Sequence, residues 1–254
     1  MKQPSTSCVT TAEKLFLYLR SGVYFTGMAS SAVLVALLML LAKPLPFSKR
    51  YGLAQLWVRF NLWSLAAVCR LKHEVTGLEN IPDEAGVILC KHQSAWETLA
   101  LQTIFPPMVF ILKQELLRIP FWGWAMATLE PISIDRSARS AALKQVLKEG
   151  NERLRSGKWV VIFPEGTRIA PGQTGKYNAS GGLLAARAGC MVVPVAHNAG
   201  EFWKRNAFLK LPGTIEVHIG PPLDAGQLSA QEVNGRAKEW IETTMRKISM
   251  HHAG

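Results

Sequence analysis

The sequence predicts an α/β domain that follows an N-terminal membrane-embedded helical segment. From residue 74 onward, short apolar runs alternate with longer helical patterns, which is typical of an α/β domain. Before that point, an uncharged run of twenty residues over 23–42 is long enough to cross a hydrocarbon core of about 30 Å as a helix. We therefore expect membrane-anchoring helices over residues 1–70 and one domain over residues 71–254.

The N-terminal segment has two possible arrangements. A cleaved signal peptide is a poor alternative, because the apolar run is long, begins late and lacks a small-residue cleavage site before Lys43. Basic residues flank the run on both sides, so both of its ends are expected in the cytoplasm. Residues 53–68 have the pattern of an interfacial helix. A shallow helical hairpin in one leaflet explains both segments, and a single span followed by an amphipathic helix remains open.

The charge pattern favours a membrane surface over nucleic acid. The chain has 29 Lys and Arg against 18 Asp and Glu, and only 19% of its residues are charged. No acidic residue occurs between Glu13 and Glu74, whereas eight basic residues do, so the basic excess adjoins the apolar part of the chain. Anionic membrane lipids are therefore the expected partners, and nucleic acid is not.

The four cysteines do not indicate a metal or redox site. Cys8, Cys69, Cys90 and Cys190 lie far apart and have none of the paired spacings of such sites. We expect reduced thiols, which suits a domain that faces the cytosol.

The expected elements of the domain follow from its apolar periodicity. Strands are expected over residues 86–90, 108–112, 159–163, 191–196 and 214–219. Helices are expected over residues 96–103, 138–156, 181–188 and 230–248, with Gly189 closing the third. Pro194 in the fourth strand predicts an edge or a bulge at that position.

The first candidate site is His92, five residues before Glu97, at the end of an apolar strand and the start of a helix. This location in an α/β sheet favours function, and a carboxylate can orient an imidazole as a general base. Five positions along an ideal helix separate side chains by about 140°, so the two meet only if His92 lies on the turn before the helix. As an alternative, Ser94 and Glu97 form a capping box.

The second candidate site is the segment 163–168, FPEGTR, which follows another apolar strand. Gly166 permits a tight turn that exposes backbone amides, and Arg168 can bind a phosphate in fork geometry. A strand-end turn with a surface arginine is the alternative. Arg136 and Lys176 could add positive charge to the same anion site, although each, taken singly, reads as a solvated surface residue.

Two weaker motifs complete the pattern. Residues 113–124 contain Lys113 and Arg118 among apolar and aromatic side chains that could border an acyl or headgroup groove, although core packing also explains them. The fourth motif is Val193-Pro194-Val195.

In order and spacing, these four motifs closely resemble the 1-acylglycerol-3-phosphate acyltransferase family over about residues 70–222. His92 and Glu97 match the first motif, although Asp is the commoner acid there. Residues 163–168 match the third motif and residues 193–195 the fourth. The second motif is matched by these residues: Lys113, Glu115, Leu116, Pro120 and Gly123.

The resemblance implies a glycerolipid acyltransferase fold, with a central mixed sheet flanked by helices. It implies transfer of a fatty acyl group from acyl-CoA or acyl carrier protein to lysophosphatidate, giving phosphatidic acid, with no metal and no cofactor besides the donor. His92 would act as the base and Glu97 would orient it. The acceptor would be held by these residues: Lys113, Arg136, Glu165, Gly166, Thr167 and Arg168. The expected location is the inner (cytoplasmic) membrane, with the catalytic domain facing the cytoplasm.

Three other functions are weighed against this one. A metallohydrolase would use His92, His197 and an acid, but the histidines lack the helical spacing of a zinc site, apart from the terminal pair. A catalytically silent membrane adaptor would not need the base and the FPEGTR segment that this chain retains. A sister enzyme that acylates glycerol 3-phosphate or another lysolipid is poorly separated by sequence.

Overall fold

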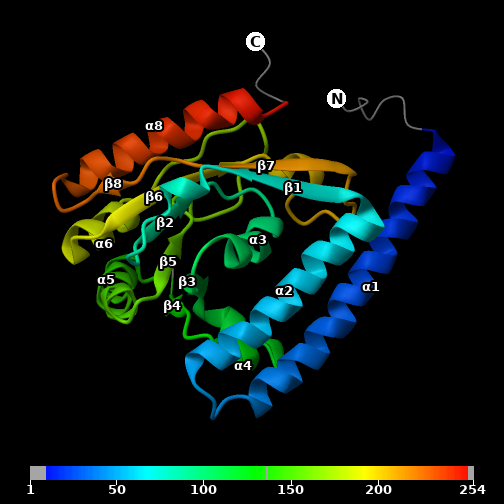
Figure 1. Ribbon diagram of the computed structural model, residues 1–254, viewed down its shortest axis with the longest axis horizontal. Helices are drawn as coiled ribbons and strands as arrows, with labels where there is room; N and C mark the ends of the chain where they lie inside the picture. Colours follow the sequence, from blue (N-terminus) through cyan, green and yellow to red (C-terminus); the bar gives the residue numbers. More distant parts are fainter. Residues whose placement is uncertain (1–9, 136, 251–254) are drawn as a thin grey trace.

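The computed structural model describes residues 10–135 and 137–250 and shows one mixed sheet between two layers of helices (Figure 1). The strands follow the order β1-β7-β6-β2-β5-β3-β4, with β8 paired to β6. All pairs are parallel except those that β6 makes with β7 and β8. The expected fold class is therefore confirmed. The strands are β1 Leu71–Thr76, β2 Val87–Cys90, β3 Met108–Lys113, β4 Ile132–Ile134, β5 Trp159–Ile162, β6 Met191–His197, β7 Gly213–Ile219 and β8 Leu223–Asp224.

The helices divide between the two faces of the sheet. They are α1 Thr11–Leu41, α2 Phe47–Cys69, α3 Trp96–Ile104, α4 Trp122–Ala127, α5 Arg139–Arg155, α6 Ser180–Ala188, α7 Ala199–Phe202 and α8 Ala230–Ile248, with the 3-10 turns η2 Leu78–Asn80 and η3 Gln114–Arg118. Because successive side chains of a strand point to opposite faces, Ile88 and Cys90 pack with α1, α2 and α3. Val87 and Leu89 pack with α5, α6 and α8.

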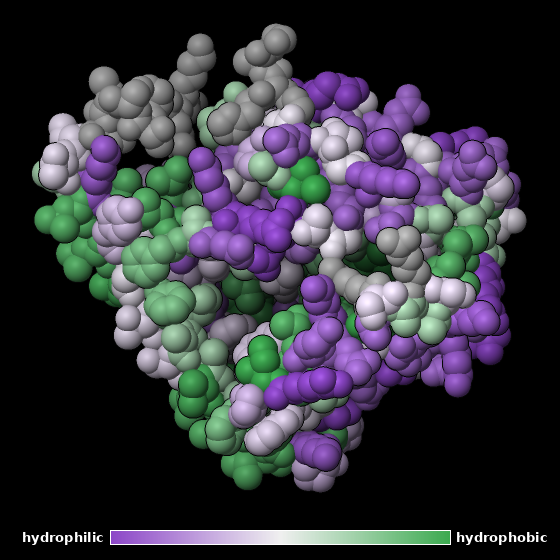
Figure 2. Space-filling view, turned by 180° about the vertical axis from the view of Figure 1, so that it is seen from behind, coloured by the Kyte–Doolittle hydropathy of each residue, from purple (hydrophilic) through white to green (hydrophobic). Residues whose placement is uncertain are grey.

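Helices α1 and α2 form a hairpin beside the sheet (Figure 1). Helix α1 begins well before the apolar run, because Thr10 and Glu13 form a capping box at its N-terminus. It is long and apolar enough to cross a membrane, and most of its apolar side chains are exposed. In Figure 2, seen from behind, they form a hydrophobic band along the edge of the molecule. These features indicate that the protein associates with a membrane.

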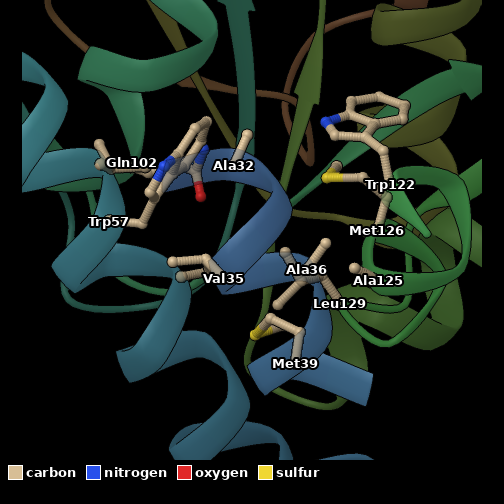
Figure 3. Close-up of a pocket in the computed structure, with 12 residues that line it drawn as sticks. Ala32, Val35, Ala36, Met39, Trp57, Gln102, Trp122, Ala125, Met126 and Leu129 are labelled. Atoms are coloured by element: carbon tan, nitrogen blue, oxygen red, sulfur yellow. The ribbon is translucent and has the colours of Figure 1, made fainter. Parts of the chain in front are cut away.

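A small apolar cavity of about 60 Å³ remains where α4 meets the hairpin (Figure 3). Short side chains on all three helices leave this space, among them Ala36, Ala54 and Ala125. Gln102 is the one amide side chain in its lining, and Trp122 is the one lining residue that belongs to the four sequence motifs. His92, Glu97 and the residues predicted to hold the acceptor do not line it. The cavity is therefore separate from the candidate site.

Pro194 lies in an interior strand, so the expectation of an edge was wrong. Strand β6 pairs with β8 through residues 191–192 and with β7 through residues 195–197, which leaves Pro194 between its two antiparallel partners. The missing N–H of proline is tolerated there, because no ladder bond on that side requires it. The Pro194 carbonyl still accepts a hydrogen bond from Gly220 N at 2.8 Å.

Candidate active site

The site lies where two neighbouring parallel strands end. Strands β2 and β5 pair in parallel, so the residues that follow Cys90 and Ile162 emerge at the same edge of the sheet. A hydrogen bond of 2.8 Å from Ile169 N to the carbonyl of His92 joins the two following loops. Two motifs more than seventy residues apart in sequence therefore form one site.

His92 and Glu97 are in direct contact. His92 Nδ1 lies 2.7 Å from Glu97 Oε1, and His92 stands on the turn that precedes α3, as the contact requires. The Glu97 side chain is fully buried, whereas the imidazole is 15% exposed. With Nδ1 facing the carboxylate, Nε2 is the nitrogen left to accept a proton. The Phe163 ring stacks on the imidazole at a centroid distance of 4.0 Å and restricts its rotation.

Glu97 also binds the backbone of the turn. Its carboxylate accepts hydrogen bonds from Gln93 N at 3.0 Å and Ser94 N at 2.8 Å. The other half of a capping box is not formed, since Ser94 Oγ accepts from Trp96 N. Burial alone would raise the pKa of Glu97, but the hydrogen bonds that the carboxylate accepts from His92 and from Ser94 N outweigh burial and lower it. Glu97 is therefore a carboxylate at neutral pH, and both sequence interpretations of it describe real contacts.

A second histidine, His197, is buried beneath the turn that carries His92. His197 is 1% exposed, and its Nε2 lies 2.9 Å from the Lys91 carbonyl and 3.9 Å from Glu97 Oε2. Its Nδ1 accepts a hydrogen bond from Ala199 N, so both ring nitrogens face backbone groups. Burial lowers the pKa of His197, which keeps it neutral. Residues 10–135 and 137–250 contain no cluster of three His, Cys, Asp or Glu residues that could hold a metal ion.

The turn after β5 carries the second motif. Gly166 has a φ of 67°, a left-handed conformation that favours glycine, and its N–H bonds to the Phe163 carbonyl at 3.0 Å. Glu165 points inward, where Oε1 lies 2.7 Å from Lys91 Nζ and Oε2 accepts from His92 N at 3.1 Å. The carboxylate of Glu165 therefore holds the His92 turn.

A cavity of about 530 Å³ opens beside the imidazole. Its polar wall contains His92, Glu165, Gly166 and Thr167, together with Asn178. Its apolar wall is formed by these residues: Ile111, Ile134, Ala142, Leu143, Val146, Ile162 and Phe163. A cavity with one polar and one apolar wall suits an amphiphilic ligand.

Comparison with known proteins identifies the family. A family model described as Acyltransferase matches residues 72–198, half of the chain. A 1-acyl-sn-glycerol-3-phosphate acyltransferase of Pseudomonas aeruginosa is 49% identical over 230 residues, which cover 89% of this chain and 90% of that protein. The chain belongs to the 1-acyl-sn-glycerol-3-phosphate acyltransferase family.

Further relatives agree with this assignment to the acyltransferases. A protein of the same name from Borreliella burgdorferi is 32% identical and is covered over 69% of each chain. The crystal structure of the 1-acyl-sn-glycerophosphate (LPA) acyltransferase, PlsC, from Thermotoga maritima has the same fold, with a TM-score of 0.76, 22% identity and coverage of 92% and 97% of the two chains. The protein is therefore an acyltransferase, as its motifs predict.

Among the described residues, the cationic side chains predicted for the site of this acyltransferase do not line the cavity. Arg168 follows the wall residue Thr167 and is half-buried, and its carbonyl accepts a hydrogen bond from Arg205 at 3.3 Å. Lys113 and Lys176 are exposed and do not line the cavity. Arg136 lies outside the described residues.

Three residues that support the site of the acyltransferase were not predicted in this role from sequence, although His197 was considered as a metal ligand. Lys91 and His197 are buried beneath the His92 turn, and Glu242 reaches Lys91 from α8. The role of Lys91 could have been inferred from sequence, because it is a charged residue between an apolar strand and His92. The role of Glu242 could not have been inferred in this way, since it is one of many charged residues in α8.

Proposed function

We propose that the protein transfers a fatty acyl group from acyl-CoA or acyl carrier protein to the sn-2 hydroxyl of 1-acyl-sn-glycerol 3-phosphate, which produces phosphatidic acid for phospholipid synthesis. The observation that carries this proposal is the contact of His92 Nδ1 with the buried Glu97 carboxylate at the rim of an amphiphilic cavity. The names of the P. aeruginosa and B. burgdorferi relatives support the same acceptor.

In the proposed mechanism, His92 moves the proton. The acceptor hydroxyl oxygen attacks the thioester carbonyl carbon while His92 Nε2 takes the hydroxyl proton. Collapse of the tetrahedral intermediate breaks the carbon–sulfur bond, and the imidazolium returns the proton to the leaving thiolate. Glu97 holds the imidazole in the tautomer with Nδ1 protonated and stabilises the imidazolium that forms.

The acceptor phosphate is assigned to the turn after β5. Gly166 and Thr167 line the cavity next to His92, and Arg168 follows them with a guanidinium that suits phosphate. Lys113 and Arg136 are proposed to add positive charge around this position. Glu165 acts by holding the His92 turn, because its carboxylate is paired with Lys91 and would repel a phosphate.

Membrane attachment is assigned to the α1–α2 hairpin. Its exposed apolar side chains would lie in the lipid, and the neighbouring basic residues would contact anionic headgroups. We propose the inner membrane as the location, with the domain of residues 71–254 facing the cytoplasm, where acyl-CoA and acyl carrier protein are found.

A substrate panel tests the proposal. The purified full chain is offered lysophosphatidate, glycerol 3-phosphate, other lysolipids and monoacylglycerol with each acyl donor, and products are identified by mass. Preferred formation of phosphatidic acid from lysophosphatidate is expected. Preference for glycerol 3-phosphate or another lysolipid would reassign the acceptor, and no transfer to any acceptor would contradict the proposal.

A further inference from the structure

Lys91 is a buried cation with three oxygen partners. Its side chain is 1% exposed, and Nζ lies 2.7 Å from Glu165 Oε1, 2.9 Å from Glu242 Oε1 and 3.2 Å from the Gln173 carbonyl. A buried ammonium with no partner would strongly destabilise the fold. These contacts therefore fix the lysine between the β5 turn, the 173–177 loop and helix α8.

The two carboxylates have further partners that hold them in place. Glu242 accepts hydrogen bonds from Thr174 Oγ1 at 2.7 Å and from the Tyr177 hydroxyl at 2.9 Å. Burial raises the pKa of Tyr177, so its hydroxyl remains a donor. Burial would raise the pKa of Glu242 as well, but the hydrogen bonds from Lys91, Thr174 and Tyr177 lower it.

The chain of contacts ends at the His92 backbone. Glu165 uses one oxygen for Lys91 and the other for His92 N. A continuous path of hydrogen bonds therefore runs from Glu242 on α8 through Lys91 and Glu165 to the peptide unit that carries the imidazole. Neither Lys91 nor Glu242 lines the cavity beside His92, so neither is expected to contact substrate.

We propose that Lys91 and Glu242 are positioning residues, which set the orientation of His92 through Glu165 and thereby make catalysis depend on the C-terminal helix. The proposal rests on the proposed role of His92 as the base. Removal of the Lys91 charge leaves two neighbouring buried carboxylates that repel each other. Glu165 then shifts, and the His92 turn shifts with it.

Replacement of either positioning residue should lower kcat and leave KM nearly unchanged. A displacement of a catalytic group by about 1 Å can cost about 10²-fold in rate. Lys91→Met and Glu242→Gln should therefore lower kcat by about 10-fold to 10²-fold, while KM for lysophosphatidate changes less than about threefold. Glu242→Asp keeps the charge and should recover part of the lost kcat.

Glu201→Gln is the matched control. Glu201 is also buried and binds the end of α8, where its Oε1 accepts from Ser249 Oγ at 2.6 Å and Met250 N at 2.7 Å, but its bonds do not reach Lys91 or Glu165. A variant that weakens only the attachment of the C-terminal end of α8, without changing the Glu242–Lys91 contact, should lower the melting temperature and leave kcat per folded molecule unchanged. Glu201→Gln should behave in this way.

The measurement uses the full chain in detergent, with kcat normalised to the folded fraction. The proposal is overturned if Glu242→Gln keeps kcat within about twofold of wild type, if Glu201→Gln loses as much kcat, or if the loss falls in KM. Should Lys91→Met fail to fold, Glu242→Gln decides. If the wild type uses an acceptor other than lysophosphatidate, the acceptor assignment fails, and the same comparison is made with the acceptor it uses.

Discussion

His92 Nδ1 lies 2.7 Å from Glu97 Oε1 because the histidine stands on the turn before α3 while the glutamate stands in its first turn. The same carboxylate binds two backbone N–H groups of that turn. Glu97 thus fixes both the loop and the imidazole that the loop carries. The longer glutamate side chain, in a position where the family more often has aspartate, reaches both.

His92→Ala should lower acyl transfer by about 10² to 10⁴-fold and leave the fold intact, because the imidazole is at the rim of the cavity and the general base is lost. Turnover of lysophosphatidate by purified variants measures this effect, and circular dichroism checks the fold. Near-normal turnover would contradict the proposed mechanism.

Glu97→Gln should lower kcat less than His92→Ala does, and it should also lower the melting temperature. Both effects are expected because the carboxylate contacts the imidazole and caps the turn. Glu97→Asp should keep substantial activity. A loss of thermal stability with unchanged kcat would restrict Glu97 to capping.

Arg168→Ala should raise KM for lysophosphatidate by about 10-fold to 150-fold and change KM for the acyl donor little. The reason is that a hydrogen bond to a charged group contributes about 1.5 to 3 kcal/mol. Arg168→Lys should recover only part of this loss, because a point charge replaces a two-pronged donor.

Monoacylglycerol, which has no phosphate, is the control acceptor for Arg168. The wild type should use it poorly, and Arg168→Ala should use it no worse. Equal losses on both acceptors would move the phosphate assignment to Lys113, Arg136 or Lys176.

The positions of the sheet and of His92 could be predicted from sequence because each depends on local patterns. The five expected strands and four expected helices are present with bounds within one or two residues. Strand β1 was not predicted, because four of its six residues are polar and it has no apolar run; its place in the sheet is set by pairing with β7. The edge strands β4 and β8 are too short to produce a periodic signal.

The contacts beneath the site could not be predicted, because they join distant parts of the chain. Lys91 and Glu242 are 151 positions apart, and only the packing of α8 against the sheet brings them together. Glu165 matches a family motif by sequence, but its partner Lys91 is visible only in three dimensions. Sequence therefore indicates which residues are functional more readily than it indicates which residues hold them.

Leu34→Glu combined with Leu38→Glu should reduce flotation with liposomes, because both side chains are exposed on α1, at 59% and 41%. Leu78→Glu, at a leucine that is 53% exposed on η2, is the matched control and should float like wild type. Equal flotation of all three proteins would contradict attachment through α1.

Removal of residues 1–70 should give a protein that is poorly active on membrane-borne acceptor. The deletion also removes core residues of α2 such as Val58 and Leu65, so the exposed leucines separate attachment from folding. A truncated chain that floats as well as the full chain would also count against the hairpin.

Stability should fall as pH is lowered from 7.5 to 5.5, and His197→Gln should remove part of this dependence. Burial holds the pKa of His197 below its ordinary value of 6.5, so the unfolded chain takes up a proton in this range while the folded protein does not. Stability is therefore retained above pH 6.5 and lost below it, at up to about 1.4 kcal/mol per pH unit until the folded-state pKa is reached. His73, whose pKa burial also lowers, contributes in the same direction.

Melting temperatures measured across this pH range test the prediction, with His218→Gln on β7 as the control. If the melting temperature of His197→Gln depends on pH as strongly as that of the wild type, a different group is responsible.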